Sequence, residues 1–290
     1  MKSPIDLDQR LQAILDSPAY RLAYQDSDLL SEDDLRPVRL HLELLKPERI
    51  LREQEVHSTV VVFGSARVQD RSTAMARLAG LEGKTPGNAT DEASLKMAQR
   101  RVEQSAHYEE ARRFAAQVSL RFQQVQRCDF VVVTGGGPGI MEAANRGAYD
   151  VGARSIGLNI TLPHEQLPNP YTTPELAFHF HYFAIRKIHF LLHARGLVVF
   201  PGGYGTMDEL FEVLTLIQTG KMPAIPVVLV GEDFWKKVIN FDHLVDEGYI
   251  SPEDRALFTC VNTAEEIMAA LDTFYAGRTP RSPAECDHFI

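Results

Sequence analysis

The sequence has few of the features that mark secreted, membrane and nucleic-acid-binding proteins. Only three of its 290 residues are cysteines, Cys128, Cys260 and Cys286, and they are scattered. They form neither a disulfide framework nor the spacing of a zinc site, so a reducing cytoplasm is the expected setting. No run of residues is apolar and long enough to span a membrane, and no apolar stretch follows Met1 as it would in a signal peptide.

Positive charge is also scarce. The chain has 30 lysines and arginines against 39 acidic residues, a net charge of −9, and it contains no basic block. This balance argues against binding to nucleic-acid polymers but permits local phosphate sites. Because 44% of the residues are hydrophobic, the chain can bury a full core, and we expect either one large domain or one domain with helical additions.

The most informative stretch is Pro201–Glu209, with the sequence PGGYGTMDE. The apolar run Gly196–Phe200 before it is typical of a buried parallel strand, and Leu210–Ile217 after it has the apolar spacing of a helix. Three glycines in four positions let the backbone approach a ligand closely, and free N–H groups at a helix start attract phosphate. A carboxylate pair, Asp208 and Glu209, ends the stretch.

Glu209 also has a purely structural interpretation. Thr206 and Glu209 have the spacing of a capping box, in which Thr206 is the N-cap and Glu209 returns to its backbone N–H. Spacing alone does not separate this interpretation from a role in a ligand site. Pro201 and the glycines favour the ligand site, because capping does not need them.

Two further predicted strands run into turns that suit a ligand. Thr59–Phe63 ends in Gly64–Arg67, and Asp129–Thr134 enters the glycine-rich turn Gly135–Ala144. Such turns lie where α/β sheets bind ligands. The second turn resembles a dinucleotide fingerprint only loosely, and no acidic residue ends the next strand, Ser155–Ile160. A nicotinamide oxidoreductase is therefore disfavoured.

The predicted helix Tyr182–His193 carries two adjacent cations. Arg186 has few polar neighbours, so we expect a buried or interfacial contact with an anion, whereas Lys187 suits a solvated face. His189 and His193 are four residues apart, as a metal-binding pair would be, but no carboxylate ligand accompanies them. Core or surface histidines are favoured over a metal site.

Three segments lie outside the regular alternation of strands and helices. Residues 1–57 are helical in pattern, and we expect a helical layer or a subunit contact. Residues 66–105 are expected to form a mobile insertion near the mouth of the site, with weak helical character at Arg71–Leu81, a loop at Gly83–Asn88 and a helix at Asp91–Gln104. A separate helix is expected at Tyr108–Val125. Residues 277–290 form a polar tail.

Strands and helices alternate through residues 58–276, which predicts an α/β fold with a doubly wound parallel sheet of the Rossmann type. The motifs of this region resemble, in the same order, those of the LOG (LONELY GUY) family. These are the cytokinin riboside 5′-monophosphate phosphoribohydrolases and their nucleoside-monophosphate nucleosidase relatives, often labelled lysine decarboxylases. The resemblance rests on Gly64–Arg67, Gly135–Ala143, Arg186–Lys187 and Pro201–Glu209.

The resemblance implies a hydrolase that cleaves the N-glycosidic bond of a nucleoside 5′-monophosphate to a free base and ribose 5-phosphate. It implies no cofactor or metal, and a homodimer or a larger homo-oligomer. The essential arginine and glutamate of the family fall on Arg186 and Glu209. The residues expected to bind phosphate or ribose are Gly64, Ser65, Gly135, Gly136, Gly137, Gly202, Gly203, Gly205 and Thr206. The residues expected to support them are Glu142, Lys187 and Asp208, the last of which replaces a glutamate common in the family.

This chemistry suits the residues. Breaking a ribosyl C–N bond builds positive charge on the sugar, which a carboxylate such as Glu209 would stabilise. Arg186 would either clamp the phosphate or help the base to depart, and both roles stay open. Decarboxylation is disfavoured because it would need a pyridoxal site with a Schiff-base lysine. The competing hypotheses are a non-catalytic carrier of a nucleotide or molybdenum cofactor and a ligand-sensing regulator.

Overall fold

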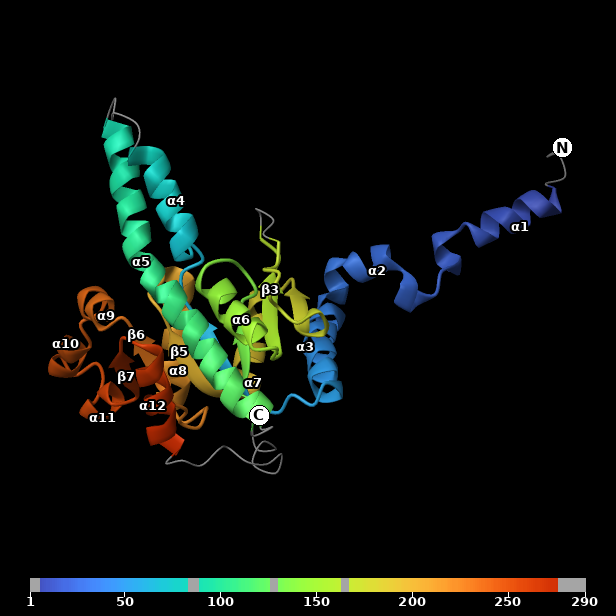
Figure 1. The fold of residues 1–290 in the computed structure, drawn as a ribbon. Helices are drawn as coiled ribbons and strands as arrows, with labels where there is room; N and C mark the ends of the chain where they lie inside the picture. The colour runs from blue at the N-terminus through green and yellow to red at the C-terminus, as the bar shows by residue number, and fades with distance from the viewer. Residues whose placement is uncertain (1–5, 83–88, 126–129, 163–166, 276–290) are drawn as a thin grey trace. The chain divides into compact units, whose positions relative to one another are not determined.

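The structure is a computed structural model that describes residues 6–82, 89–125, 130–162 and 167–275 (Figure 1). It divides into two compact units, residues 1–48 and 49–290. The loop expected at Gly83–Asn88 and the tail from residue 277 lie outside the described residues.

The first unit consists of short helices. Asp6 and Asp26 cap two of them, because each carboxylate accepts a hydrogen bond from a backbone N–H of the first turn. Leu7 and Leu11 stay exposed, and α1 buries none of its residues. The elements are α1 (Leu7–Leu15), η1 (Pro18–Tyr20), η2 (Ala23–Gln25), α2 (Ser27–Ser31), η3 (Asp33–Leu35) and the start of α3 (Arg36–Glu53).

The second unit is built on a seven-stranded sheet in which every neighbouring pair of strands is parallel. The spatial order is β4-β3-β2-β1-β5-β6-β7, so the chain first builds outward from β1 and then crosses to its other side. This order confirms the predicted Rossmann-like α/β fold. The strands are β1 (Thr59–Phe63), β2 (Val131–Thr134), β3 (Ser155–Ile160), β4 (Ala177–Phe180), β5 (Ala194–Val199), β6 (Val227–Val230) and β7 (Phe258–Val261).

Valine-rich strands explain why this sheet is buried on both faces. Along β1, Val61 and Phe63 belong to one core, and Val60 and Val62 belong to the other. This alternation follows from the two-residue period of a strand, and it lets a continuous apolar run serve two cores at once.

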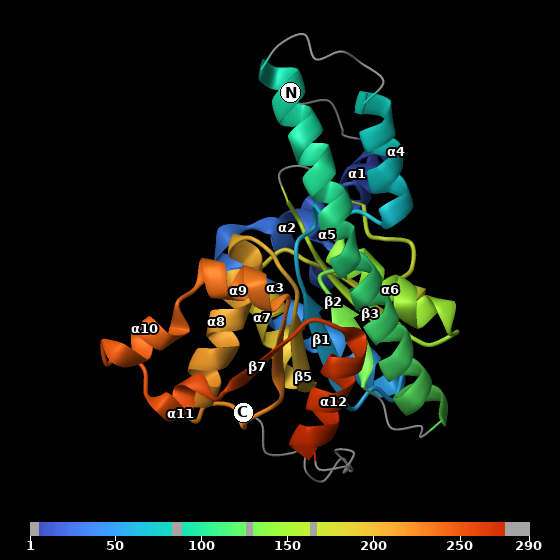
Figure 2. The same cartoon turned by 60° about the vertical axis from the view of Figure 1, so that its left-hand side comes forward.

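Each core is closed by its own layer of helices (Figure 2). The first core is covered by α7 (Phe183–Leu192), α8 (Tyr204–Gln218), α9 (Glu232–Val238) and α10 (Phe241–Asp246). The second is covered by α5 (Ala89–Ser119), α6 (Ile140–Asp150) and α12 (Ala264–Tyr275). The remaining elements are α4 (Arg71–Glu82), η4 (Leu120–Val125), η5 (Pro174–Leu176) and α11 (Pro252–Arg255). None of the helices in the described ranges has the length and apolar character needed to cross a membrane.

The prediction of two separate helices before and after residue 105 was wrong. α5 is continuous over 31 residues, from Ala89 to Ser119. No glycine or proline interrupts it, and the hydroxyl of Ser105 donates to the carbonyl of Val102 within the same helix at 2.6 Å. The expected insertion therefore supplies α4 and the first half of α5, which run side by side in both views (Figures 1 and 2).

Candidate functional site

The candidate site lies at the carboxyl ends of β1 and β5, the two neighbouring strands between which the chain order reverses. Ligands of open α/β sheets bind at such a point, because the chain connections that follow the two strands lead away in opposite directions and leave a crevice between them. A cavity of about 760 Å³ is found there. The turns on its two sides are joined, since the backbone N–H of Ser65 donates to the carbonyl of Pro201 at 3.0 Å.

The structure brings most of the predicted site residues to this one cavity. Those that line it are Gly64, Ser65, Gly135, Arg186, Gly202, Gly203, Gly205, Thr206 and Glu209. Those that do not line it are Gly136, Gly137, Glu142, Lys187 and Asp208. The second group lies behind or beside the first, as the contacts below show.

The cavity meets the N-terminus of α8. This helix begins at Tyr204, with Gly203 as an N-cap that offers no side-chain hydrogen bond. The first N–H groups of a helix have no partner within it, so this end of α8 favours an anion. Position 202 requires glycine, because a Cβ there would overlap the hydroxyl of Thr206.

The capping-box interpretation of Glu209 is wrong. Because α8 begins at Tyr204, Thr206 is already the third residue of the helix and cannot be its N-cap. The N–H of Thr206 bonds to the carbonyl of Gly203 at 3.0 Å. Glu209 lies beyond the first turn, and its burial has to be explained in another way.

The turn after β2 packs directly on the turn after β1. Gly139 adopts a φ of +74° as the N-cap of α6, and a Cβ there would overlap the carbonyl of Ser65. The N–H of Ile140 donates to the same carbonyl at 3.1 Å. Glycine at this position therefore lets the two turns share one edge of the cavity.

A buried network of amides, which the sequence analysis missed, supports this glycine turn. Asn169 donates from Nδ2 to the carbonyl of Gly137 at 3.0 Å and to Oδ1 of Asn145 at 2.9 Å. Its backbone N–H donates to the carbonyl of Gly136 at 2.8 Å. The hydroxyl of Thr134 donates a hydrogen bond to Oδ1 of Asn145 at 2.7 Å. The one available signal was that α6 carries Asn145 among small apolar residues, where a polar side chain needs a partner.

Glu142 is held from the side of α5. Its Oε1 accepts a hydrogen bond of 2.8 Å from the hydroxyl of Tyr108, a residue that is almost fully buried. Burial is the main cause that raises the pKa of Tyr108, so its hydroxyl stays a donor. Glu142 is thus fixed behind the glycine turn.

Glu209 is the most perturbed acid of the cavity. The residue is only 4% exposed. Burial raises the pKa of its carboxyl from 4.5 to about 7, against the opposing positive charge of Lys187. Glu212 and Asp208 add to the rise, and Arg186 opposes it. A buried carboxyl that titrates near neutrality is typical of a functional group.

Arg186 faces the same cavity without an ionic partner. Its Nε is buried and has no hydrogen-bond partner, and its guanidinium lies 5.2 Å from the ring centre of Phe183 and 5.4 Å from that of Phe190. Burial lowers the pKa of Arg186, while the carboxylate of Glu209 raises it. Within the described part of the chain, no ion pair links Arg186 to a carboxylate, so the cavity holds a cation that an anionic ligand would complement.

Lys187 differs from the solvated lysine that was predicted. It is half-buried, and its Nζ forms ion pairs with Asp208 at 3.0 Å and with Glu212 at 3.1 Å. These pairs tie α7 to α8 outside the cavity. Asp208 is therefore occupied at the surface of α8, where its side chain is 59% exposed.

His179 and His189 contact a hydroxyl group and an aromatic ring. Nε2 of His179 lies 3.2 Å from the hydroxyl of Thr161, and the buried ring of His189 packs against Phe180. In the ranges that the structure covers, no three His, Cys, Asp or Glu side chains come together as metal ligands would.

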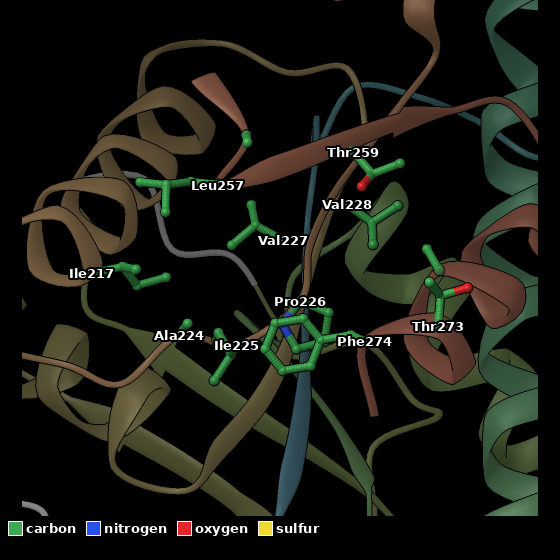
Figure 3. A pocket seen from close by; sticks show the side chains of 12 residues that line it. Ile217, Ala224, Ile225, Pro226, Val227, Val228, Leu257, Thr259, Thr273 and Phe274 are labelled. Carbon is green, nitrogen blue, oxygen red and sulfur yellow. The ribbon is translucent and has the colours of Figure 1, made fainter. Parts of the chain in front are cut away.

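A second cavity, of about 310 Å³, lies at the opposite edge of the sheet, where β6 and β7 begin (Figure 3). Ile225, Pro226 and Phe274 are among its apolar lining residues, and the polar side-chain groups of its described lining are the hydroxyls of Thr259 and Thr273. It offers no acid or base for chemistry.

Comparison with known proteins agrees with the motifs. Residues 141–271 match a family model described as "Possible lysine decarboxylase". Over 171 residues the chain is 31% identical to the probable cytokinin riboside 5′-monophosphate phosphoribohydrolase LOGL3 of Oryza sativa subsp. japonica, which covers 55% of this chain and 75% of that protein. It is 31% identical over 163 residues to the corresponding Arabidopsis thaliana protein LOG3, which covers 55% and 74%.

Among solved structures, the molybdenum cofactor binding protein from Rippkaea orientalis aligns with 75% of this chain and 97% of its own. The two are 13% identical, with a TM-score of 0.44.

The raised pKa of Glu209 leads to a prediction about stability. The folded protein binds the proton of this carboxyl more tightly than the unfolded chain does, so stability falls as pH rises from about 4.5 through 7. We expect Glu209→Gln, which removes the charge, to change the free energy of unfolding relative to wild type at each pH. This change should be more stabilising at pH 8 than at pH 5, by about 2–3 kcal/mol. Urea denaturation at both pH values measures the difference.

Glu103→Gln on the exposed surface of α5 is the matched control, and its effect should be small and equal at the two pH values. An equal effect of Glu209→Gln at pH 5 and pH 8 would contradict the raised pKa.

Proposed function

Because the chain belongs to the LOG family of cytokinin riboside 5′-monophosphate phosphoribohydrolases, we propose that it hydrolyses nucleoside 5′-monophosphates to a free base and ribose 5-phosphate. The observation that carries the proposal is the cavity in which a buried carboxyl, Glu209, and Arg186, a cation with no ion pair among the described residues, accompany the open N-terminus of α8. AMP and cytokinin riboside 5′-monophosphates are the substrates to test first. A cytoplasmic location stays a prediction, because it rests on the pattern of cysteines alone.

The N-terminus of α8 would hold the 5′-phosphate. Gly202, Gly203 and Gly205 supply backbone without side chains, and the helix dipole adds favourable potential for an anion. Ser65, across the joined turns, adds a hydroxyl to the same cavity. Binding energy from the phosphate would then hold the sugar in position for reaction.

Glu209 would act on the sugar. Cleavage of the C–N bond leaves positive charge on the ribosyl ring, and a carboxylate in a poorly solvated site stabilises that charge more strongly than in water. Glu209 would also be able to orient the ribose hydroxyls or the attacking water. Arg186 would contact either the phosphate or the departing base.

A decarboxylase is a weaker candidate. A pyridoxal enzyme needs a lysine that can form a Schiff base at the cofactor. None of the described residues that line the cavity is a lysine, and Lys187 is bound to Asp208 and Glu212 beside it.

We expect the purified protein to release adenine from AMP and to act on adenosine far less well. Loss of the phosphate removes hydrogen bonds to a charged group, so kcat/KM should fall by about a hundredfold or more. Chromatography of the base and of ribose 5-phosphate measures both reactions. The common monophosphates and a cytokinin riboside 5′-monophosphate should be tested together.

Equal kcat/KM for AMP and adenosine would contradict the phosphate site at α8. Binding of these nucleotides without any base release would favour the non-catalytic carrier.

Glu209→Gln should lower kcat by about a hundredfold or more, because it removes one electrostatic group and keeps its shape. In wild type, kcat/KM should rise with pH through about 7, since the ionised carboxylate is the active form. Steady-state kinetics between pH 5 and pH 9 measure both effects, and Arg186→Ala should also lose activity.

The matched control is Asp208→Asn on the neighbouring residue, whose carboxylate is engaged with Lys187 outside the cavity. If Glu209→Gln turned over at the wild-type rate while Asp208→Asn did not, the roles of the two acids would have to be exchanged.

A homodimer is the assembly that the surface favours. Large apolar side chains are exposed on α7 and α8 next to the cavity, including Phe183, Ile188, Tyr204 and Phe211. Tyr204 is 96% exposed although it lines the cavity, so a second subunit on this face would also border the site.

Phe211→Asp should therefore shift the protein from dimer to monomer in sedimentation velocity, since it places a charge in an apolar interface. Met97→Asp, at a similarly exposed position of α5, is the control and should leave the assembly unchanged. A wild-type monomer would contradict the dimer.

A further inference from the structure

Three arginines, one of which lines the cavity, are not used by the proposed reaction. Arg67 follows β1 and lines the cavity itself. Arg77 lies on α4 and Arg101 on α5, the two helices that run side by side above this edge of the sheet in Figure 1.

The three side chains form one group. The guanidinium of Arg101 donates a hydrogen bond to the backbone carbonyl of Arg67, which holds α5 against the turn after β1. Burial lowers the pKa of Arg101, and so do the positive charges of Arg67 and Arg77, which therefore lie within electrostatic reach of it.

No acid neutralises this group among the residues that the structure describes. None of the three arginines takes part in an ion pair there. Asp70, three residues after Arg67, is engaged at the start of α4, where it accepts hydrogen bonds from the hydroxyl of Ser72 and the N–H of Thr73. These contacts lower the pKa of Asp70 to about 2 although its burial opposes them.

Three uncompensated guanidinium groups in a chain with a net charge of −9 need a reason. Like charges at short range repel one another, and an anion between them removes that cost. The planar fork of arginine fits phosphoryl oxygens with two parallel hydrogen bonds. Arg67 lines the same cavity as the N-terminus of α8, so a ligand bound at α8 shares the cavity with this arginine.

We propose that Arg67, Arg77 and Arg101 form an anion subsite at the rim of the cavity for a second phosphoryl group. The proposal deepens the proposed function and rests on it for the position of the first phosphate at α8. The second phosphoryl group belongs either to the same nucleotide, as in a nucleoside 5′-diphosphate, or to a free phosphate ion bound beside a monophosphate.

The test is isothermal titration of AMP and ADP at low ionic strength. Glu209→Gln serves as the parent protein to slow turnover, and chromatography after each titration checks that the ligands are intact. Two hydrogen bonds to a charged group predict that ADP binds the parent about tenfold or more tightly than AMP. In Arg77→Gln/Arg101→Gln this preference should fall to within about twofold, while the affinity for AMP is unchanged.

Arg100→Gln is the matched control, because Arg100 is an exposed neighbour on the same helix and should keep the preference. Arg77→Gln alone removes one positive charge and keeps the hydrogen bond from Arg101 to Arg67. It therefore tests the charge without disturbing that contact, and it should lose part of the preference for ADP. Titration of AMP with and without inorganic phosphate tests the free ion. A gain in affinity for AMP that the double variant loses would assign the subsite to free phosphate.

The proposal is overturned if neither ADP nor added phosphate distinguishes the parent from the double variant. It is also overturned if the double variant weakens AMP and ADP equally, because the arginines would then hold the first phosphate. Both outcomes are separate from a failure of the proposed function, which is judged by base release from AMP in the wild-type protein.

Discussion

The close packing of three backbone turns at the carboxyl edge of the sheet is the constraint on which the site depends. The turn after β1 lies between the other two, since the N–H of Ser65 bonds to Pro201 and its carbonyl accepts the N–H of Ile140. A side chain at Gly139 would overlap that same carbonyl. Because β1 is flanked by β2 on one side and β5 on the other, only this strand order brings the three turns together. The glycines are therefore required first for the turns to meet, and the cavity follows from their meeting.

This packing creates an electrostatic conflict that gives the site its character. The same elements bury one carboxyl, Glu209, and leave Arg186 without an ion pair to any described residue, although each group would be more stable in water or in a direct pair. The carboxyl responds with a pKa raised to about 7. Lys187, the third charged group, is drawn away by Asp208 and Glu212 on the outer side of α8. The free energy of unfolding is lowered by such an arrangement, and a bound phosphate next to Arg186 would recover part of it.

The sequence predicted the fold and most of the residues around the cavity, because both depend on local patterns. Apolar runs such as that of β1 indicate buried parallel strands, and glycines directly after them indicate turns at one edge of the sheet. The first residue of α8 was harder to predict. The spacing of Thr206 and Glu209 suits a capping box, which the actual start of the helix at Tyr204 excludes. The partners of Lys187 and the amide network of Asn145 and Asn169 involve residues far apart in the sequence, and no single segment contains that information.

In the proposed function, the position of Glu209 on α8 connects phosphate binding to the chemistry. Glu209 comes five residues after Tyr204, which starts the helix, so about 7.5 Å of helix axis separates the two. One rigid element thus carries both the proposed phosphate-binding end and the carboxyl, at a spacing on the scale of a sugar phosphate. A phosphate at the helix start would place the ribose beside Glu209 without any movement of the backbone. The capping spacing that first suggested a structural role for Glu209 has, on a helix that starts three residues earlier than the capping box would require, the effect of setting this distance.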